Sequence, residues 1–125
     1  MMQVLVDTSV WSDHFRHRDE QLVVLLQHSC VLMHPMVRGE LACGCWQHRH
    51  QVLALLKNLP QVSEAMHDEA LYCLEQHKIM SQGIGFITLH LIAATLLTGN
   101  ALFWTRDRRL NALAQVLNVR WKAGH

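Results

Sequence analysis

The sequence has few residues of the kinds that mark special classes of protein. Only two prolines and six glycines occur in 125 residues, and 17% of the residues are charged, so neither a disordered nor a collagen-like chain is indicated. No hydrophobic run approaches the roughly 20 residues that cross a membrane, and no basic stretch precedes the first apolar run, which predicts a cytoplasmic protein. The formal net charge is only +1, so any affinity for nucleic acid has to come from a local patch.

The four cysteines lack the paired C-x-x-C spacing of common zinc and redox sites. Cys43 and Cys45 are followed closely by His48 and His50, so a zinc site of these four side chains is one interpretation. We expect this segment to form one helix, on which residues two positions apart face different directions. The sequence therefore favours reduced cysteines without a metal.

Half of the residues are hydrophobic, and they form short runs that alternate with longer amphipathic segments. Strands are expected at Gln3–Val6, Val31–Met33 and Ala101–Trp104, with weaker candidates around Val62 and at Val119–Trp121. Helices are expected from Thr8 to about His14, over Leu22–Leu26, from Val37, over Val52–Leu59, Asp68–Lys78, Thr88–Thr98 and Asn111–Leu117. This alternation predicts one α/β domain over residues 1–125, with a central, mostly parallel sheet of four or five strands and helices on both faces.

Acidic residues are few, and two of them come just after predicted strands. Asp7 follows Gln3–Val6 and Asp107 follows Ala101–Trp104, and ligands of open α/β sheets bind beyond the carboxyl ends of the strands. Glu40, after the second strand, is expected to point into the same space. Carboxylates are suitable ligands for Mg²⁺ or Mn²⁺, and such a site can cut a phosphodiester. The alternative is structural: Asp7 begins a helix and Asp107 pairs with neighbouring arginines.

Four motifs are spread along the chain: Val6-Asp7-Thr8-Ser9-Val10-Trp11, Gly39-Glu40-Leu41-Ala42, Gly83-Ile84-Gly85 and the segment from Leu102 to Leu110. Together they resemble a PIN-domain toxin of the VapC type, from Val4 to about Val119. The resemblance implies an endoribonuclease that depends on Mg²⁺ or Mn²⁺, forms a homodimer and is neutralised by a cognate antitoxin protein. It also implies that Asp7, Glu40 and Asp107 are the catalytic and metal-binding residues.

The sequence departs from the family pattern at Thr88. The family has an aspartate in a stretch resembling G-I-G-F-x-D-x-H-L, and Thr88 occupies that position here. Threonine can still cap a helix, but its neutral hydroxyl is a poorer ligand for a hard dication than a carboxylate. We therefore expect weakened metal binding and cleavage with an intact fold. A catalytically silent module that holds antitoxin or RNA is the second interpretation, and an unrelated α/β domain with structural acids is the third.

Several polar residues beside the predicted acids are candidates for holding RNA. Arg106 and Arg108 flank Asp107, and the planar guanidinium suits phosphate; a solvated rim is the alternative. Ser9 and Thr105 are expected to orient metal-bound water or phosphate, although both residue types also serve as caps and turns.

Apolar and aromatic residues offer two further expectations. The segments Leu22–Leu26 and Val52–Leu59 hold more apolar positions than one small core needs, which favours contact with a partner, with helix packing as the alternative. Trp11 and Trp104 are expected to pack in the core, although tryptophan can also stack on bases.

Overall fold

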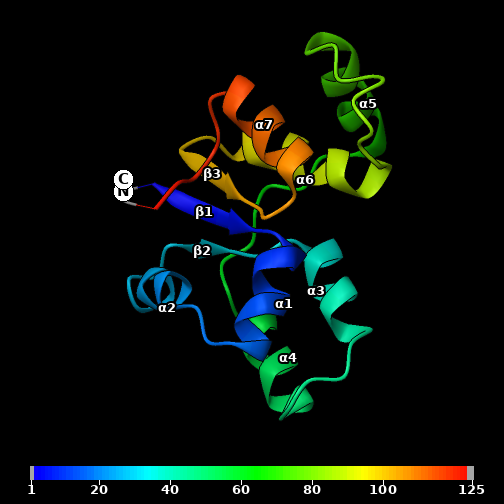
Figure 1. Cartoon of the computed structure of the whole chain (residues 1–125). Coiled ribbons are helices and arrows are strands. Elements are labelled where there is room, and N and C mark those ends of the chain that lie inside the picture. The colour runs from blue at the N-terminus through cyan, green and yellow to red at the C-terminus, as the bar shows by residue number, and fades with distance from the viewer. Residues whose placement is uncertain (1, 124–125) are drawn as a thin grey trace.

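The computed structural model describes residues 2–123 and contains a parallel sheet of three strands in the order β2-β1-β3 (Figure 1). The strands are β1 (Gln3–Val6), β2 (Val31–Leu32) and β3 (Ala101–Trp104). In the central strand, Val4 pairs with Val31 on one side and with Leu102 on the other. Residues 4–6 are buried, as expected for a strand that is covered on both faces.

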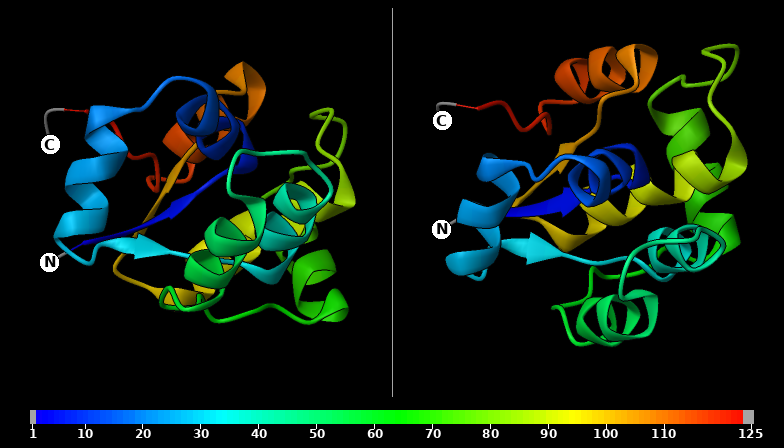
Figure 2. Two further views of the ribbon diagram at one scale, coloured as in Figure 1. Left: turned by 90° about the horizontal axis from the view of Figure 1, so that it is seen from below. Right: turned by 60° about the horizontal axis from the view of Figure 1, so that its bottom comes forward.

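Seven helices in the described part of the chain surround the sheet. They are α1 (Thr8–Arg16), α2 (Glu20–Gln27), α3 (Pro35–Ala42), α4 (Arg49–Lys57), α5 (His67–Gln76), α6 (Phe86–Thr98) and α7 (Arg108–Val116). Helices α1 and α6 lie on opposite faces of the sheet (Figure 2, left), so the predicted α/β arrangement is confirmed. None of the helices within residues 2–123 is long and apolar enough to cross a membrane.

The predicted number of four or five strands is wrong, because both outer edges of the sheet are shorter than expected. Gln61 forms a single parallel bridge with Met33, and Arg120 forms one with Phe103. Pro60, which has no N–H to donate, directly precedes the first of these bridges. The segments around Val62 and Val119–Trp121 thus lie at the two edges but do not form strands.

Most helices begin one to three residues earlier than the sequence predicts, among them α3, α6 and α7, which carry or adjoin the predicted site residues. Helix α3 begins at Pro35, where His34 Nδ1 accepts a hydrogen bond from the Met36 N–H (3.0 Å), and proline suits this first helical position. Helix α7 begins at Arg108 and is capped by Asp107, and α6 begins at Phe86 after Gly85. Thr88 therefore lies inside α6 and does not cap it.

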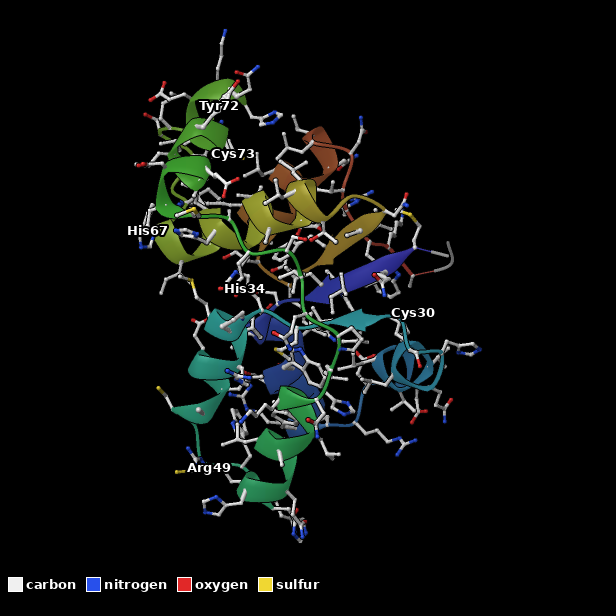
Figure 3. The ribbon with its side chains drawn as sticks, turned by 180° about the vertical axis from the view of Figure 1, so that it is seen from behind. Cys30, His34, Arg49, His67, Tyr72 and Cys73 are labelled. Carbon is white, nitrogen blue, oxygen red and sulfur yellow. The ribbon has the colours of Figure 1, made fainter. Side chains whose placement is uncertain are left out.

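The segment between α3 and α4 is a loop, so the expected single helix through Cys43 and His50 is wrong. Arg49, at the start of α4 (Figure 3), holds this loop in place. Its Nε donates to the Gly44 carbonyl over 3.0 Å, and its Nη2 donates to the carbonyl of Ala42. The guanidinium thereby ties the end of one helix to the beginning of the next.

Aromatic residues pack in the core as predicted. Trp11 is 2% exposed and Trp104 is 7% exposed. Trp11 also contacts Phe15 on α1, and Phe15 contacts Trp46 in the loop between α3 and α4. These side chains fix α1 on the sheet, and the first turn of α1 borders the ends of the strands, where Asp7 lies.

Candidate active site

Asp7 lies at the carboxyl end of β1, beside the end of β3. Its backbone N–H donates to the Trp104 carbonyl (2.9 Å), which continues the pairing of the two strands. Its side-chain Oδ2 accepts two hydrogen bonds, from Thr105 Oγ1 (2.7 Å) and from Ser9 Oγ (2.9 Å). The half-buried carboxylate is therefore fixed by hydroxyls from two separate parts of the chain.

Thr105 and Ser9 link Asp7 to the segment that carries the second predicted acid. Thr105 is buried, and its Oγ1 accepts a hydrogen bond from the Asp107 N–H (3.1 Å). Ser9 Oγ accepts one from the Arg106 N–H (3.0 Å). Both hydroxyls thus donate to Asp7 and accept from the backbone that follows β3, so they orient a carboxylate and a turn together.

Glu40 reaches the same region from α3. Its Oε1 accepts a hydrogen bond from the Thr8 hydroxyl (2.8 Å), and Thr8 is the residue next to Asp7. Sequence reasoning missed this role of Thr8. The signal available was its place between Asp7 and Ser9 at the start of a helix, but the partner is 32 positions away.

Asp107 has a structural function and also faces a cavity. Its Oδ1 accepts a hydrogen bond from the Leu110 N–H (2.9 Å), which caps α7. The cavity beside it has a volume of about 360 Å³. It is lined by the loop residues 83–85, by Thr88 in the first turn of α6, and by residues 107–110 at the start of α7, which include Asp107 and Arg109. Thr88 and Asp107 therefore share one cavity, although they are far apart in the sequence.

The three predicted acids suit a hard divalent cation in their donor chemistry. Each carboxylate uses one oxygen in the hydrogen bonds above, and within residues 2–123 the second oxygen of Asp7, Glu40 and Asp107 accepts none. Carboxylate oxygens with free lone pairs are the ligands of Mg²⁺ and Mn²⁺. The same described residues contain no group of three or more His, Cys, Asp or Glu side chains arranged around one ion position.

The two arginines predicted to hold RNA differ in their surroundings. The Arg106 guanidinium forms ion pairs with Asp13 (3.0 Å) and Asp19 (2.5 Å) and lies 5.7 Å from the centre of the Trp104 ring. Arg108 is exposed and makes no ion pair within the described part of the chain. Arg108 thus keeps its guanidinium available, whereas Arg106 connects the end of β3 to α1 and α2.

The ion pair with Arg106 affects the pKa of Asp19. Burial acts to raise the pKa of the Asp19 carboxyl, but hydrogen bonds from the Leu22 N–H and from Arg106 outweigh it and lower the pKa below its usual value. The ionised carboxylate is therefore the favoured form, and it accepts the guanidinium of Arg106.

A further arginine, Arg109, follows Arg108 in the same motif. It lines the cavity of Asp107 and Thr88, and its Nη1 would be only 2.5 Å from a Cβ atom on Gly83. Gly83 has a φ of +72°, which disfavours other residues there. The glycine thus allows the loop before α6 to approach the start of α7 closely.

Comparison with known proteins assigns the family. A PIN-domain family model matches residues 4–116. The chain belongs to the PIN-domain family. Among curated relatives of this PIN domain, two proteins named Ribonuclease VapC32, from Mycobacterium tuberculosis strains CDC 1551 / Oshkosh and ATCC 25618 / H37Rv, are each 42% identical over 109 residues. These alignments cover 87% of this chain and 88% of each relative.

A solved structure agrees with the PIN fold. The crystal structure of PAE2754 from Pyrobaculum aerophilum superposes with a TM-score of 0.60 and covers 89% of this chain and 84% of that one. Its sequence identity is 17%, so this likeness concerns the fold alone. The resemblance to a VapC-type PIN protein that the sequence motifs indicated is confirmed by the family match and the two relatives.

Proposed function

We propose that this PIN-domain protein is a metal-dependent endoribonuclease toxin of the VapC type, which cleaves phosphodiester bonds in RNA. The observation that carries the proposal is the link through Thr105, which bonds to the carboxylate of Asp7 and to the backbone of Asp107. The names of the two ribonuclease relatives support it. When bound, Mg²⁺ or Mn²⁺ would lower the pKa of a water and shield the phosphate charge.

In this proposal the acids hold the ion and the neighbouring hydroxyls hold the acids. Asp7, Glu40 and Asp107 would supply the oxygens that accept no hydrogen bond within residues 2–123. Ser9 and Thr105 keep Asp7 in one orientation, because both donate to the same oxygen. Such hydrogen bonds to ligating carboxylates strongly affect metal affinity.

RNA would be held mainly by Arg108, which has an exposed guanidinium beside the cavity of Asp107. A planar guanidinium binds phosphate oxygens with two hydrogen bonds. Arg106 was assigned the same role from the sequence. Its ion pairs with Asp13 and Asp19 favour instead an indirect role, in which it holds the segment that carries Asp107.

Thr88 weakens this activity in our proposal, because a hydroxyl replaces a carboxylate in the cavity that Asp107 faces. The second candidate function is a catalytically silent PIN module that binds antitoxin or RNA without cutting it. Two observations favour the second candidate: Thr88 at this position, and the lack of a three-ligand group within residues 2–123.

The proposed partners are a cognate antitoxin and a second copy of the chain, in the cytoplasm. Exposed apolar side chains on or next to α5 and α6 support a protein-binding surface: Met66, Leu71, Tyr72, Phe86, Ile87 and Leu97 are each at least 45% exposed. In the segments where the sequence indicated surplus apolar residues, Val24 and Leu55 are exposed, whereas Leu22 and Leu56 are buried.

The experiment that tests the function compares the unaltered protein with Thr88→Asp. Both are incubated with structured RNA, with and without MnCl₂. We expect weak Mn²⁺-dependent cleavage that Thr88→Asp increases at least about tenfold, since even residues that only hydrogen-bond to a metal ligand commonly change metal affinity by that factor, and a carboxylate is itself a ligand for hard dications. Thr88→Asn is the matched control for size and polarity without charge.

Asp7→Asn in the Thr88→Asp background controls for contaminating nucleases. Cleavage only after Thr88→Asp would support the silent module. If neither protein cleaves RNA or gains affinity for Mn²⁺ although both are folded, the nuclease proposal is wrong.

A further inference from the structure

A second cavity adjoins the candidate active site on the other side of Arg108. Its volume is about 270 Å³, and its lining includes Thr105, Arg108, Trp121 and Lys122. Arg108 lines both this cavity and the one that holds Asp107 and Thr88. A ligand that extends from one cavity into the other therefore passes the guanidinium of Arg108.

The aromatic part of this second cavity is a pair of tryptophans. The Trp121 and Trp104 rings have centroids 4.2 Å apart with 42° between their planes. Trp104 is buried beneath, whereas Trp121 is partly exposed. The Trp121 backbone N–H donates to the Phe103 carbonyl (2.9 Å), so the main chain of Trp121 is fixed at the edge of the sheet while its ring packs on Trp104. A fixed, partly exposed ring is a suitable surface for a flat, unstacked base.

The charges around this ring suit a polyanion. Arg108 and Lys122 are exposed and form no ion pair within residues 2–123, and none of the described residues that line the cavity is acidic. Asn111 adds an amide that can donate to or accept from the edge of a base. Cations, one amide and an aromatic ring together are typical of sites that bind single-stranded nucleic acid.

We infer that Trp121, Arg108 and Lys122 form a subsite for one nucleotide of single-stranded RNA, beside the bond that is cut. The base stacks on Trp121, and the phosphates on either side contact Arg108 and Lys122. This inference rests on the proposed function, because it takes RNA as the substrate of the adjacent site. It adds a contact with a base, which a site built of carboxylates and one arginine does not supply.

Binding without cleavage tests the inference. A fluorescein-labelled single-stranded RNA is titrated with protein in EDTA, and the dissociation constant is measured by fluorescence anisotropy. Trp121→Ala is expected to weaken binding by about fivefold or more, and Trp121→Phe, which keeps a ring, to retain most of the affinity. Lys122→Ala is expected to lower the slope of log K against log salt by about one.

Lys57→Ala, at the end of α4, is the matched control for Lys122→Ala. Lys57 is also exposed and does not line the second cavity, and α4 lies at the opposite end of the molecule from α7, which carries Arg108 (Figure 1), so its removal should leave both the affinity and the salt slope unchanged. Equal effects of the two lysine variants would mean that general charge, and not this cavity, binds the RNA, which would overturn the inference.

RNA with single abasic nucleotides separates stacking from damage to the fold, because it probes the unaltered protein. One abasic position should weaken RNA binding to the unaltered protein. The same abasic position should have little further effect on binding to Trp121→Ala. If Trp121→Ala does not fold, the abasic position should weaken binding to Trp121→Phe less than it weakens binding to the unaltered protein. If no abasic position weakens binding, or if a poly-glutamate peptide of equal charge competes as well as the RNA, the inference is wrong.

The outcomes separate this inference from the nuclease proposal. Trp121-dependent RNA binding, without cleavage by either the unaltered protein or the Thr88→Asp variant, would retain the subsite and reject the nuclease. Mn²⁺-dependent cleavage with RNA affinity that is independent of Trp121 would retain the nuclease and reject the subsite.

Discussion

Thr105, at the end of β3, donates its hydroxyl hydrogen to Oδ2 of Asp7, at the end of β1, over 2.7 Å and across 98 positions of sequence. Ser9 donates to the same oxygen. Hydrogen bonds to a charged group contribute more than neutral ones, about 1.5–3 kcal/mol each. The orientation of the Asp7 carboxylate is thus set by side chains that the parallel pairing of β1 and β3 brings together.

The first prediction concerns Thr105. Thr105→Val should lower the affinity for Mn²⁺ and the rate of RNA cleavage by about 10-fold or more, because Asp7 loses a hydrogen bond that orients it. Thr105→Ser keeps the hydroxyl and should retain most of both. Calorimetric titration with Mn²⁺ and cleavage at several Mn²⁺ concentrations measure the effect. Equal behaviour of the valine and serine variants would rule out this role.

The second prediction separates the two functions of Asp107. Asp107→Asn keeps an oxygen that accepts from the Leu110 N–H, so the unfolding free energy should change little, whereas cleavage should be lost with the charge. Asp107→Ala should lose cleavage and also about 1 kcal/mol of stability with the cap. Urea unfolding and the cleavage assay give the two readouts. Full cleavage by Asp107→Asn would exclude Asp107 from metal binding.

The third prediction is a pH dependence of stability through His34. Its ring is 2% exposed, and burial lowers its pKa below the ordinary value of about 6.5. Glu64 acts to raise this pKa and His90 to lower it. The unfolded chain therefore takes up the proton first, so the contribution of His34 to stability is complete above pH 6.5 and is lost as the pH falls through its lowered pKa.

His34→Asn is the variant that checks this prediction. Asparagine accepts the hydrogen bond from the Met36 N–H that now caps α3 at His34 Nδ1, but it does not titrate. Urea unfolding between pH 5 and 8 should show that the unaltered protein loses more stability on acidification than His34→Asn does. Parallel curves for the two proteins would show that His34 has no part in the pH dependence.

The fourth prediction compares two arginines of the same motif. Arg106→Ala should lower the unfolding free energy by less than about 1 kcal/mol, because its ion pairs with Asp13 and Asp19 are partly exposed to solvent. Arg108→Ala should leave stability unchanged and weaken RNA binding. Urea unfolding and fluorescence anisotropy measure both effects. If Arg106→Ala weakens RNA binding and Arg108→Ala lowers stability, the roles that we assign to the two arginines are wrong.

The sheet and the place of the acids could be predicted from the sequence for a simple physical reason. Valine-rich runs such as Gln3–Val6 fit a strand that is buried on both faces, and parallel strands bring the residues after them to one edge. The expectation that Asp7 and Asp107 each follow a strand is confirmed by the bounds of β1 and β3, and the structure adds that these two strands pair with each other. The family resemblance added Thr88, which lies in the cavity of Asp107.

The remaining features depend on contacts between distant residues or on local caps. The hydrogen bond between Thr8 and Glu40, and the ion pair between Arg106 and Asp19, join residues 32 and 87 positions apart, which no local pattern reveals. Helix α7 begins at Arg108 because Asp107 caps it. The first turn of α7 is charged and lacks the helical spacing of apolar residues, so the sequence pattern does not predict this start. The structural and catalytic interpretations of Asp107 are therefore compatible with each other.

The short edges of the sheet also restrict how this protein can associate. Beyond β2 and β3 the pairing is reduced to the single bridges at Gln61 and Arg120, and Pro60 borders the first. An incoming peptide that added itself as an extra strand would find little backbone to bind at either margin. We therefore expect any protein partner of this domain to be recognised by side chains of its helices and loops, and strand exchange between copies, a common route to aggregation, to be disfavoured.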